Sequence, residues 1–337
     1  MSTHCKSVFI VAPFQIEVRK QPIPHPAANQ VLVQTLVSAI SPGTEMLFYR
    51  GQIPPDMHAD STLPGLSQVV SYPLQYGYAC VGRVAAVGAN VATDWLDQLV
   101  FAFQPHQSHF VTEPPQLLKV PANLTPEQAA LLPNMETAVN FAMDGRPSIG
   151  ERVAIFGQGI VGLLTTSLLS QYPLAALTVL DRYELRRACA VQGGATQAFD
   201  PLNMTAQLCD RHLRDYDLVY ELSGSPAALD QAIACAGFGG RVIIGSWYCE
   251  KRADLHLGGA FHRSRIQLSS SQVSTIGAEW SARWDKARRL DVAWRMLAQL
   301  DYQRLITHRF HVEQAAAAYA LIDQQPQQAI QVLLTYE

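Results

Sequence analysis

The pattern of hydrophobic and polar positions changes character at about residue 150. From Ser7 to about Val120, short apolar, strand-like runs are broken repeatedly by Pro and Gly, and helical periodicity is nearly absent. This part of the chain is therefore expected to form an irregular β-rich domain. Its expected strands are Ser7–Val11, Gln15–Lys20, Gln30–Ala39, Tyr78–Val87 and Leu99–Ala102.

Two segments of this first part carry local signals. The stretch from Ile53 to Pro73 is expected to form a long loop, and loops of that length tend to be lids or substrate walls. Thr125, followed by Pro126, is typical of a helix N-cap with proline at the first helical position. The helix that starts there is expected to continue through Ala142.

From residue 150 onward, apolar strand-like runs alternate regularly with helix-like segments. This alternation predicts a parallel sheet that is covered by helices on both faces. The expected strands are Arg152–Phe156, Ala176–Leu180, Gln197–Phe199, Asp217–Leu222, Arg241–Ile244 and Arg265–Ser271. The expected helices are Leu163–Ser170, Glu184–Gln192, a segment around Leu202–Arg211, and a helix capped by Ser225 that ends at Cys235.

The alternation stops after Ser271. Two helices, Ser281–Leu300 and Val312–Gln324, and a final strand, Ala329–Thr335, are expected to complete the chain. The sheet domain is therefore predicted to be inserted into the first domain, to which both ends of the chain belong. The expected boundaries are 1–134 for the first part of that domain, 135–271 for the sheet domain and 272–337 for the return.

The first strand of the alternating part runs directly into a Gly-x-Gly-x-x-Gly motif, Gly157 to Gly162, which is followed by a helix. Gly157 permits the tight turn, Gly159 lets the backbone approach a pyrophosphate, and Gly162 lets helix and strand pack closely. The exposed N–H groups at the helix start then meet the negative charge of the phosphates. Because strand, turn and helix agree, we predict dinucleotide binding rather than a merely structural glycine turn.

An acidic residue, Asp181, ends the second strand of this part, roughly 20 residues beyond the motif, where it would accept hydrogen bonds from an adenosine ribose. Its carboxylate would repel a 2′-phosphate, so NAD is the expected cofactor, with NADP as the alternative. Arg182 and Arg186 follow closely and could weaken that preference. Alternatively, these arginines belong to a solvated helix face.

Composition narrows the class of protein. A chain of 337 residues with 48% apolar and 16% charged residues is expected to form two soluble globular domains. The net charge of −3 and the lack of a basic run argue against nucleic acid as a partner. No apolar stretch approaches the roughly 18 residues of a membrane span, and the N-terminus lacks a signal peptide's apolar core. The cysteines form no Cys-x-x-Cys pair, so reduced thiols and a cytoplasmic location are expected; they are Cys5, Cys80, Cys189, Cys209, Cys235 and Cys249.

Several segments outside the glycine motif also carry recognisable sequence. They are Leu36-Val37-Ser38-Ala39-Ile40, Tyr49-Arg50-Gly51, Gly77-Tyr78-Ala79-Cys80-Val81-Gly82-Arg83-Val84 and Val87-Gly88. Together with the central nucleotide-binding unit, they resemble the medium-chain dehydrogenase/reductase family over nearly the whole chain. The resemblance implies an α/β fold in which a Rossmann doubly wound parallel sheet is inserted into a β-rich GroES-like catalytic domain.

Two further segments narrow the resemblance. They are Ser41-Pro42-Gly43-Thr44-Glu45, and Phe261-His262-Arg263 with Ser270-Ser271-Gln272-Val273-Ser274. Both are similar to a zinc-independent branch of the family, the branch of the bacteriochlorophyllide a dehydrogenase that oxidises a hydroxyethyl side chain.

The resemblance also shows where zinc ligands would lie. Zinc-dependent members use an early Cys, a His in Gly-His-Glu, and a third Cys or Glu, and the matching positions here are Ser41, Tyr78 and Pro133. No thiolate, imidazole or carboxylate stands there, and the four-cysteine structural zinc lobe is missing too, so no zinc is expected. The spacings His106-x-x-His109 and His308-x-x-His311 each lack a third ligand, and such histidines are usually surface or strand residues.

Without zinc, a side chain must handle the hydroxyl proton as hydride leaves for the nicotinamide. Tyr78 takes the place of the lost histidine, and Glu45 matches the acid that follows the first ligand. We therefore expect Tyr78 to donate or accept the proton and Glu45 to orient it. A nearby carboxylate raises a phenol's pKa, which the positive nicotinamide ring partly offsets. Ser41 and Thr44 are alternative hydroxyl relays, and His262 supplies an imidazole that titrates near neutral pH.

Each of these residues also has a structural alternative. Tyr78 could be a core aromatic, Thr44 and Glu45 could hold their loop through backbone hydrogen bonds, and His262 could contact a cofactor phosphate or a neighbouring subunit. Thr137 falls where the family places a threonine beside the nicotinamide. The expected cofactor-binding residues are Gly157, Gln158, Gly159, Ile160, Val161, Gly162, Asp181, Arg182, Thr137 and Ser223.

The resemblance implies a zinc-independent, NAD-linked oxidoreductase that transfers hydride between nicotinamide and a secondary alcohol or ketone. A bulky or polyhydroxylated small-molecule substrate is expected, such as a tetrapyrrole side chain, a sugar or a cyclitol. The alternatives are an NADPH-dependent reductase of conjugated C=C bonds or quinones, and a non-catalytic nucleotide-binding relative. Family members commonly pair through the last strands of the nucleotide domain, so a homodimer is expected.

Overall fold

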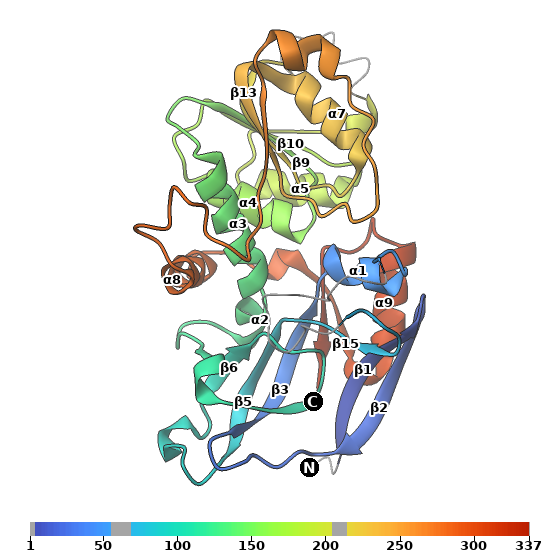
Figure 1. The fold of residues 1–337 in the computed structure, drawn as a ribbon, viewed down its shortest axis with the longest axis vertical. Coiled ribbons are helices and arrows are strands. Elements are labelled where there is room, and N and C mark those ends of the chain that lie inside the picture. Colours follow the sequence, from blue (N-terminus) through green and yellow to red (C-terminus); the bar gives the residue numbers. More distant parts are fainter. Residues whose placement is uncertain (1–3, 55–68, 204–213, 337) are drawn as a thin grey trace. The chain divides into compact units, whose positions relative to one another are not determined.

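The computed structural model describes residues 4–54, 69–203 and 214–336 (Figure 1). The chain divides into two compact units. The terminal unit consists of Met1–Pro133 and Leu297–Glu337, and the inserted unit consists of Asn134–Met296. One unit is thus inserted into the chain of the other.

The inserted unit ends later than the expected residue 271, because the segment after it is held to helix α3 (Leu132–Gly145). Arg289 on helix α8 (Lys286–Ala298) is fully buried and donates to Glu136 and Asn140, both on α3. Trp280 donates its indole N–H to the carbonyl of Met143 at 3.1 Å. These contacts fix residues that the sequence pattern assigned to the other domain.

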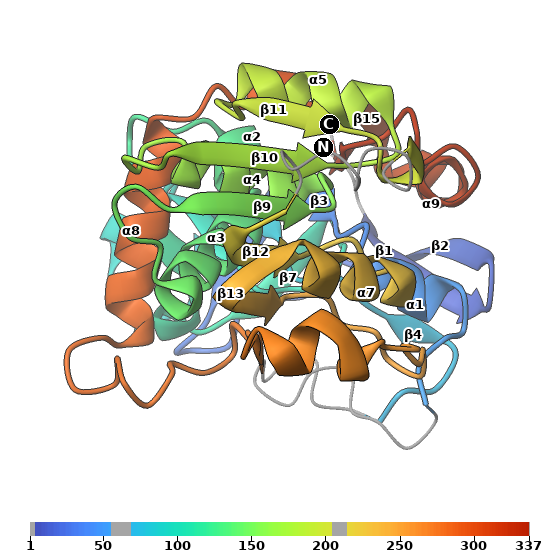
Figure 2. The same cartoon turned by 90° about the horizontal axis from the view of Figure 1, so that it is seen from above.

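A six-stranded parallel sheet forms the centre of the inserted unit, in the order β11-β10-β9-β12-β13-β14 (Figure 2). Phe156 at the end of β9 lies opposite Leu180 of β10 and Glu221 of β12, so the carboxyl ends of the three strands are level. The strands are β9 (Arg152–Phe156), β10 (Ala176–Leu180), β11 (Gln197–Phe199), β12 (Tyr216–Glu221), β13 (Ala236–Ile244) and β14 (Gln267–Ser270).

Helices pack against this sheet through apolar side chains. Helix α7 (Pro226–Cys235) buries Leu229 and Ile233 in a cluster with Phe156 and Val219, while α4 (Ile160–Leu169) packs on β9 and β10. Helix α5 (Glu184–Gln192) packs on β10 and β11. The predicted alternation of strands and helices is confirmed, and the expected helix around Leu202–Arg211 lies outside the described residues from 204 onward.

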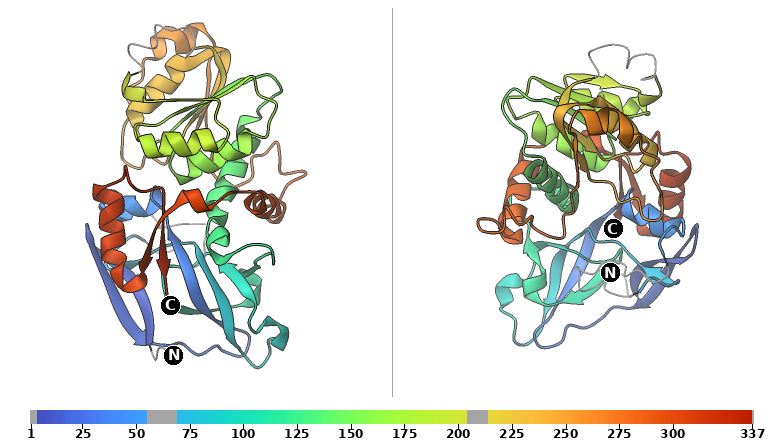
Figure 3. Two further views of the ribbon diagram at one scale, coloured as in Figure 1. Left: turned by 180° about the vertical axis from the view of Figure 1, so that it is seen from behind. Right: turned by 45° about the horizontal axis from the view of Figure 1, so that its top comes forward.

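The terminal unit contains a seven-stranded sheet in the order β15-β16-β3-β5-β6-β8, in which β7 also pairs with β3, and a three-stranded sheet β2-β1-β4. The last strand of the chain, β16, runs antiparallel to β3 (Figure 3). The C-terminal return thus completes a sheet that the N-terminal segment begins. The strands are β1 (His4–Ala12), β2 (Gln15–Pro22), β3 (Val31–Ile40), β4 (Leu74–Gln75), β5 (Cys80–Val87), β6 (Leu99–Ala102), β7 (His109–Thr112), β8 (Leu118–Lys119), β15 (Ile306–His311) and β16 (Gln331–Thr335).

Several helices differ from the expected pattern. Helix α1 (Thr44–Tyr49) was not predicted, and α9 (Ala315–Gln324) starts after a short 3₁₀ turn. The single helix expected from Thr125 is two helices, α2 (Pro126–Ala129) and α3. The break follows from Pro133, which has no N–H to donate to the preceding turn. The predicted N-cap is confirmed: Thr125 Oγ1 accepts from the amide of Gln128 at 3.2 Å.

Candidate functional site

The glycine motif forms the turn between β9 and α4 in the inserted unit. Gly157 has φ +91°, and a Cβ there would lie 2.5 Å from the Cα of Ser223. A Cβ on Gly162 would lie 2.0 Å from the carbonyl oxygen of Gly157. Both positions therefore need glycine for the fold itself. A Cβ on Gly159 would meet nothing within 4 Å, so that glycine leaves open space over the start of the helix.

Helix α4 begins with uncapped N–H groups at this open space. Its N-cap is Gly159, which has no side chain to accept from the first turn. Such N–H groups, with the positive end of the helix dipole, favour an anion. Ile160 is buried and Val161 is half-buried, so these apolar side chains anchor the start of the helix.

Asp181 links the glycine motif to the end of β10. Its carboxylate is 7% exposed and accepts from the amide of Gln158 at 2.7 Å and from the amide of Tyr183 at 2.8 Å. The acid expected to bind ribose is thus held against the glycine turn by backbone hydrogen bonds. The Gln158 side chain is fully buried; it accepts from the Thr166 hydroxyl at 2.8 Å and donates to the carbonyl of Gly157 at 3.2 Å, so it supports the turn from inside.

Two arginines flank the Tyr183 ring beside this acid. The guanidinium of Arg182 lies 4.7 Å from the ring centroid, and that of Arg186 lies 4.8 Å from it. Arg186 also approaches the Asp181 carboxylate at 4.0 Å. Burial lowers the pKa of Arg186, which the nearby Asp181 opposes. The expected ribose end therefore carries positive charge as well as the carboxylate.

The remaining candidates of the inserted unit lie on separate elements. Thr137 is half-buried on α3, and His262 is exposed just after the helical turn Leu257–Phe261. Ser223 follows β12 and donates its amide to Glu221 at 2.8 Å. Glu221 is fully buried. It was not among the predicted site residues, because no local sequence motif indicates a role for it.

In the terminal unit, Tyr78 and Ser41 form a pair of hydroxyl groups. The phenol of Tyr78 donates to Ser41 Oγ at 2.6 Å. Ser41 is 7% exposed and Tyr78 is half-buried. Thr44, the first residue of α1, is also half-buried. Two of the expected proton carriers are therefore hydrogen-bonded to one another.

Glu45 lies behind this pair rather than beside the phenol. Its Oε1 accepts from the amide of Ser41 at 2.8 Å, and its Oε2 accepts from the Tyr319 hydroxyl at 2.5 Å. The same Oε2 lies 2.9 Å from His106 Nε2. The expected orientation of Tyr78 by Glu45 thus takes an indirect form, in which Ser41 connects the two. The partner His106 was not predicted to belong to this site, because its sequence context indicated only a possible metal spacing with His109.

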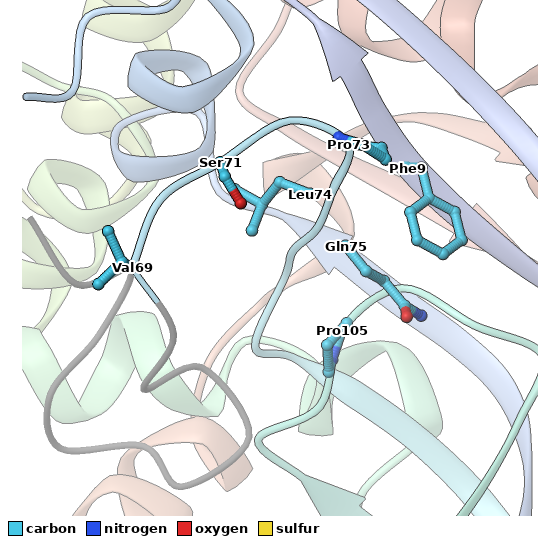
Figure 4. A pocket seen from close by; sticks show the side chains of 7 residues that line it. All are labelled: Phe9, Val69, Ser71, Pro73, Leu74, Gln75 and Pro105. Carbon is cyan, nitrogen blue, oxygen red and sulfur yellow. The ribbon is translucent and has the colours of Figure 1, made fainter. Parts of the chain in front are cut away.

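A hollow of about 350 Å³ lies elsewhere in the terminal unit, beside β1 and β4 (Figure 4). It contains none of the predicted site residues. Its lining residues are Phe9, Val69, Ser71, Pro73, Leu74, Gln75 and Pro105.

Comparison with known proteins adds relatives but no matching family model. Sorbitol dehydrogenase of Bacillus subtilis is 25% identical over 268 residues, which are 68% of this chain and 71% of that protein. The 2-desacetyl-2-hydroxyethyl bacteriochlorophyllide A dehydrogenase of Cereibacter sphaeroides is 24% identical over 93% of each chain. The structure of 2R,3R-butanediol dehydrogenase from Bacillus subtilis has a TM-score of 0.79 and 18% identity, and covers 99% of this chain and 100% of its own. The chain is homologous to the medium-chain dehydrogenases and shares their fold.

The solved structures of similar fold also include one with a bound cofactor. The rspB alcohol dehydrogenase of Escherichia coli CFT073, complexed with NADH, has a TM-score of 0.78 at 19% identity and covers 99% of this chain and 100% of its own. None of the helices in the described ranges is both long and apolar enough to cross a membrane. The cysteines at 5, 80, 189, 235 and 249, the five that lie in those ranges, are free thiols.

The positions that the resemblance matches to zinc ligands carry a hydroxyl at Ser41, a phenol at Tyr78 and no donor at Pro133. Zinc sites in proteins use thiolate, imidazole or carboxylate. Among residues 4–54, 69–203 and 214–336, no three His, Cys, Asp or Glu side chains gather so as to hold a metal ion. His109 Nδ1 bonds with Ser108 Oγ at 3.0 Å, and His308 stacks on Phe310.

Proposed function

We propose that the chain is a nicotinamide-dependent dehydrogenase that interconverts a secondary alcohol and its ketone, with NAD as the preferred cofactor. The arrangement of Asp181 against the glycine turn is the observation that carries the proposal. A buried carboxylate is held by the Gln158 amide at 2.7 Å, next to a helix start that Gly159 leaves open. A phosphate bound at the start of α4 and a ribose bound at Asp181 are two parts of an adenine dinucleotide. The homology to alcohol and polyol dehydrogenases supports the same chemistry.

The Ser41–Tyr78 pair supplies the proton chemistry in this proposal. When bound, NAD accepts the hydride, which leaves the substrate carbon with the electron pair of its C–H bond. The hydroxyl proton must then pass to a group within hydrogen-bond reach. Tyr78 donates to Ser41 in the absence of substrate, so both oxygens are already aligned to receive an alcohol. Reduction runs the same proton path in reverse.

Zinc independence is part of the proposal. It is supported by the donor chemistry of Ser41, Tyr78 and Pro133, which offers none of the groups that zinc uses in the homologous enzymes. The hydroxyl pair then replaces the metal in organising the alcohol. Stoichiometric zinc in the purified protein, lost together with activity on chelation, would overturn this part.

The homologues support a polyhydroxylated or bulky substrate. Their names include sorbitol and L-threonine dehydrogenases and an enzyme of a hydroxyethyl bacteriochlorophyllide. We propose a sugar, a cyclitol or a tetrapyrrole side chain as the substrate class. The homodimer and the cytoplasmic location remain predictions.

The test is turnover of NAD with a panel of polyols and secondary alcohols by wild type and Tyr78→Phe. Removal of a general acid–base group costs about 10²–10⁴-fold in rate, so kcat should fall by that factor while NADH affinity is unchanged. Tyr72→Phe is the matched control, because its phenol donates only within the terminal unit, to the carbonyl of Phe48 at 2.6 Å. Unchanged turnover of Tyr78→Phe would remove Tyr78 from the reaction.

A further inference from the structure

His106 and Glu45 form a fully buried pair beneath the Ser41–Tyr78 hydroxyls. Both side chains are 0% exposed, and Nε2 of the imidazole lies 2.9 Å from Oε2 of the carboxylate. A polar pair at this depth is costly unless every donor and acceptor is matched. The contacts around it show that matching.

The hydrogen bonds around the pair give each of its polar atoms a partner. Burial raises the pKa of Tyr319 and of Tyr336 well above the ordinary value, so both phenols keep their protons. Tyr319 donates to Glu45, and the hydroxyls of Tyr336 and Ser38 lie 2.8 Å apart. Ser38 Oγ also lies 2.7 Å from His106 Nδ1. A carboxylate only accepts hydrogen bonds, so Nε2 is the imidazole atom that donates to Glu45.

His106 also touches the backbone that carries Tyr78. Gly77 has φ +117°, and a Cβ there would lie 2.7 Å from Cδ2 and 2.8 Å from Nε2 of the imidazole. The amide of His106 donates to the carbonyl of Tyr76 at 3.1 Å. The histidine is therefore packed directly against the residue that precedes the phenol.

Through these contacts, His106 is connected to the backbone of both hydroxyl residues, Ser41 and Tyr78. Through Glu45, His106 holds the amide of Ser41; through Gly77, it sets the backbone of Tyr78. The link from Glu45 to Ser41 passes through a backbone N–H, which does not relay a proton in this chemistry. The pair thus controls position rather than carrying the proton of the alcohol.

We propose that His106 is a positioning residue for the reaction, which acts through Glu45 and Gly77 to hold the Ser41–Tyr78 hydroxyl pair in its reactive geometry. The proposal rests on the proposed function for its kinetic consequence. A displacement of about 1 Å at such a pair can cost 10²-fold in rate.

The experiment compares His106→Gln with His106→Asn. The longer amide places its nitrogen near the Nε2 position and still reaches Glu45, whereas the shorter amide does not. We expect His106→Asn to lower kcat at least tenfold with the substrate KM and NADH dissociation constant within twofold, and His106→Gln to recover most of the loss. Gly77→Ala, which displaces the imidazole, should reproduce the loss. His109→Asn is the matched control, since His109 is a nearby buried histidine that bonds with Ser108.

Equal kcat in wild type and His106→Asn would overturn the proposal, as would equal losses in the Asn and Gln variants. A second measurement needs no catalytic turnover, so it can be made even if His106→Asn unfolds or no substrate is found. The titration of the Tyr78 phenol is measured as the ultraviolet difference between each protein and its Tyr78→Phe derivative. We expect Glu45→Gln to lower the midpoint because a negative charge is removed, and His106→Gln to shift it less. If the wild type binds no NADH, the proposed function is wrong. If the titration midpoint of the Tyr78 phenol is the same in Glu45→Gln and in wild type, the proposed positioning network is wrong.

Discussion

Substitution of alanine at the three glycines of the nucleotide turn separates folding from cofactor binding. A methyl group on Gly162 would stand 2.0 Å from the carbonyl oxygen of Gly157, and backbone atoms on both sides prevent an easy adjustment. Overpacking of this kind costs about 1–3 kcal/mol or more. Gly162→Ala should therefore lower the free energy of unfolding by at least that amount.

Gly159→Ala is the informative counterpart. The residue has φ −66° and ψ −176°, an extended conformation open to any residue, and its added methyl would contact nothing. Loss of unfolded-chain entropy favours alanine by about 0.4–1 kcal/mol, and the poorer N-cap opposes it by a similar amount. Stability should thus stay within about 1 kcal/mol of wild type. NADH affinity, by contrast, should change: a methyl group at the pyrophosphate position should weaken NADH binding at least tenfold, about 1.4 kcal/mol.

Urea unfolding measures the stability of the variants, and energy transfer from tryptophan to bound NADH measures binding. The expected pattern is a stable Gly159→Ala with weak binding and an unstable Gly162→Ala. Full NADH affinity in Gly159→Ala would refute the assignment of this open space to the pyrophosphate. Unchanged stability in Gly162→Ala would refute the steric reading of the turn.

Three other predictions concern charge. Asp181→Asn should lower the ratio of NADH to NADPH affinity at least tenfold, measured by titration of each dinucleotide, and an unchanged ratio would show that the acid does not select the cofactor. Arg289→Met leaves Glu136 buried without its partner and should lower the free energy of urea unfolding by about 3–5 kcal/mol. Arg295→Met removes only the exposed ion pair with Asp291 and should lower it by less than about 0.5 kcal/mol. Equal losses in the two variants would contradict an effect of burial. Burial raises the pKa of Asp144, so the native state holds that proton to higher pH than the unfolded chain, and stability should fall as the pH rises above about 4. Asp144→Asn should flatten this fall in a pH series of unfolding midpoints, and an unaltered slope would exclude Asp144 as its source.

The parts of the fold that the sequence predicted are those whose signal is local. Strands such as Ala176–Leu180 are continuous apolar runs, and the glycine turn is defined within six residues. Helix α1 was missed because the residues from Glu45 to Tyr49 are all buried, which leaves no polar face to reveal a helical period. The single helix expected from Thr125 to Ala142 is divided near Pro133. The division was not predicted because apolar residues continue across it.

The candidate site shows the same limit. Ser41 and Tyr78 were singled out through the resemblance because they match positions of zinc ligands, and Glu45 because it matches the acid that follows the first of them. His106 was missed since its contact with Glu45 joins residues 61 positions apart. Tyr319 lies 274 positions from the same carboxylate. The Tyr319 contact follows from the return of the C-terminal segment to the first domain, and no short motif predicts either contact.

The most direct test of the account is transfer of label to the cofactor. Wild-type protein is incubated with NAD and secondary alcohols or polyols deuterated at the carbinol carbon, and the recovered NADH is analysed by mass spectrometry and proton NMR. The account predicts deuterium at C4 of the nicotinamide, formed far more slowly by Tyr78→Phe. One NADH bound per chain, with no label transferred from any alcohol, would contradict it and favour a nucleotide-binding protein without dehydrogenase activity.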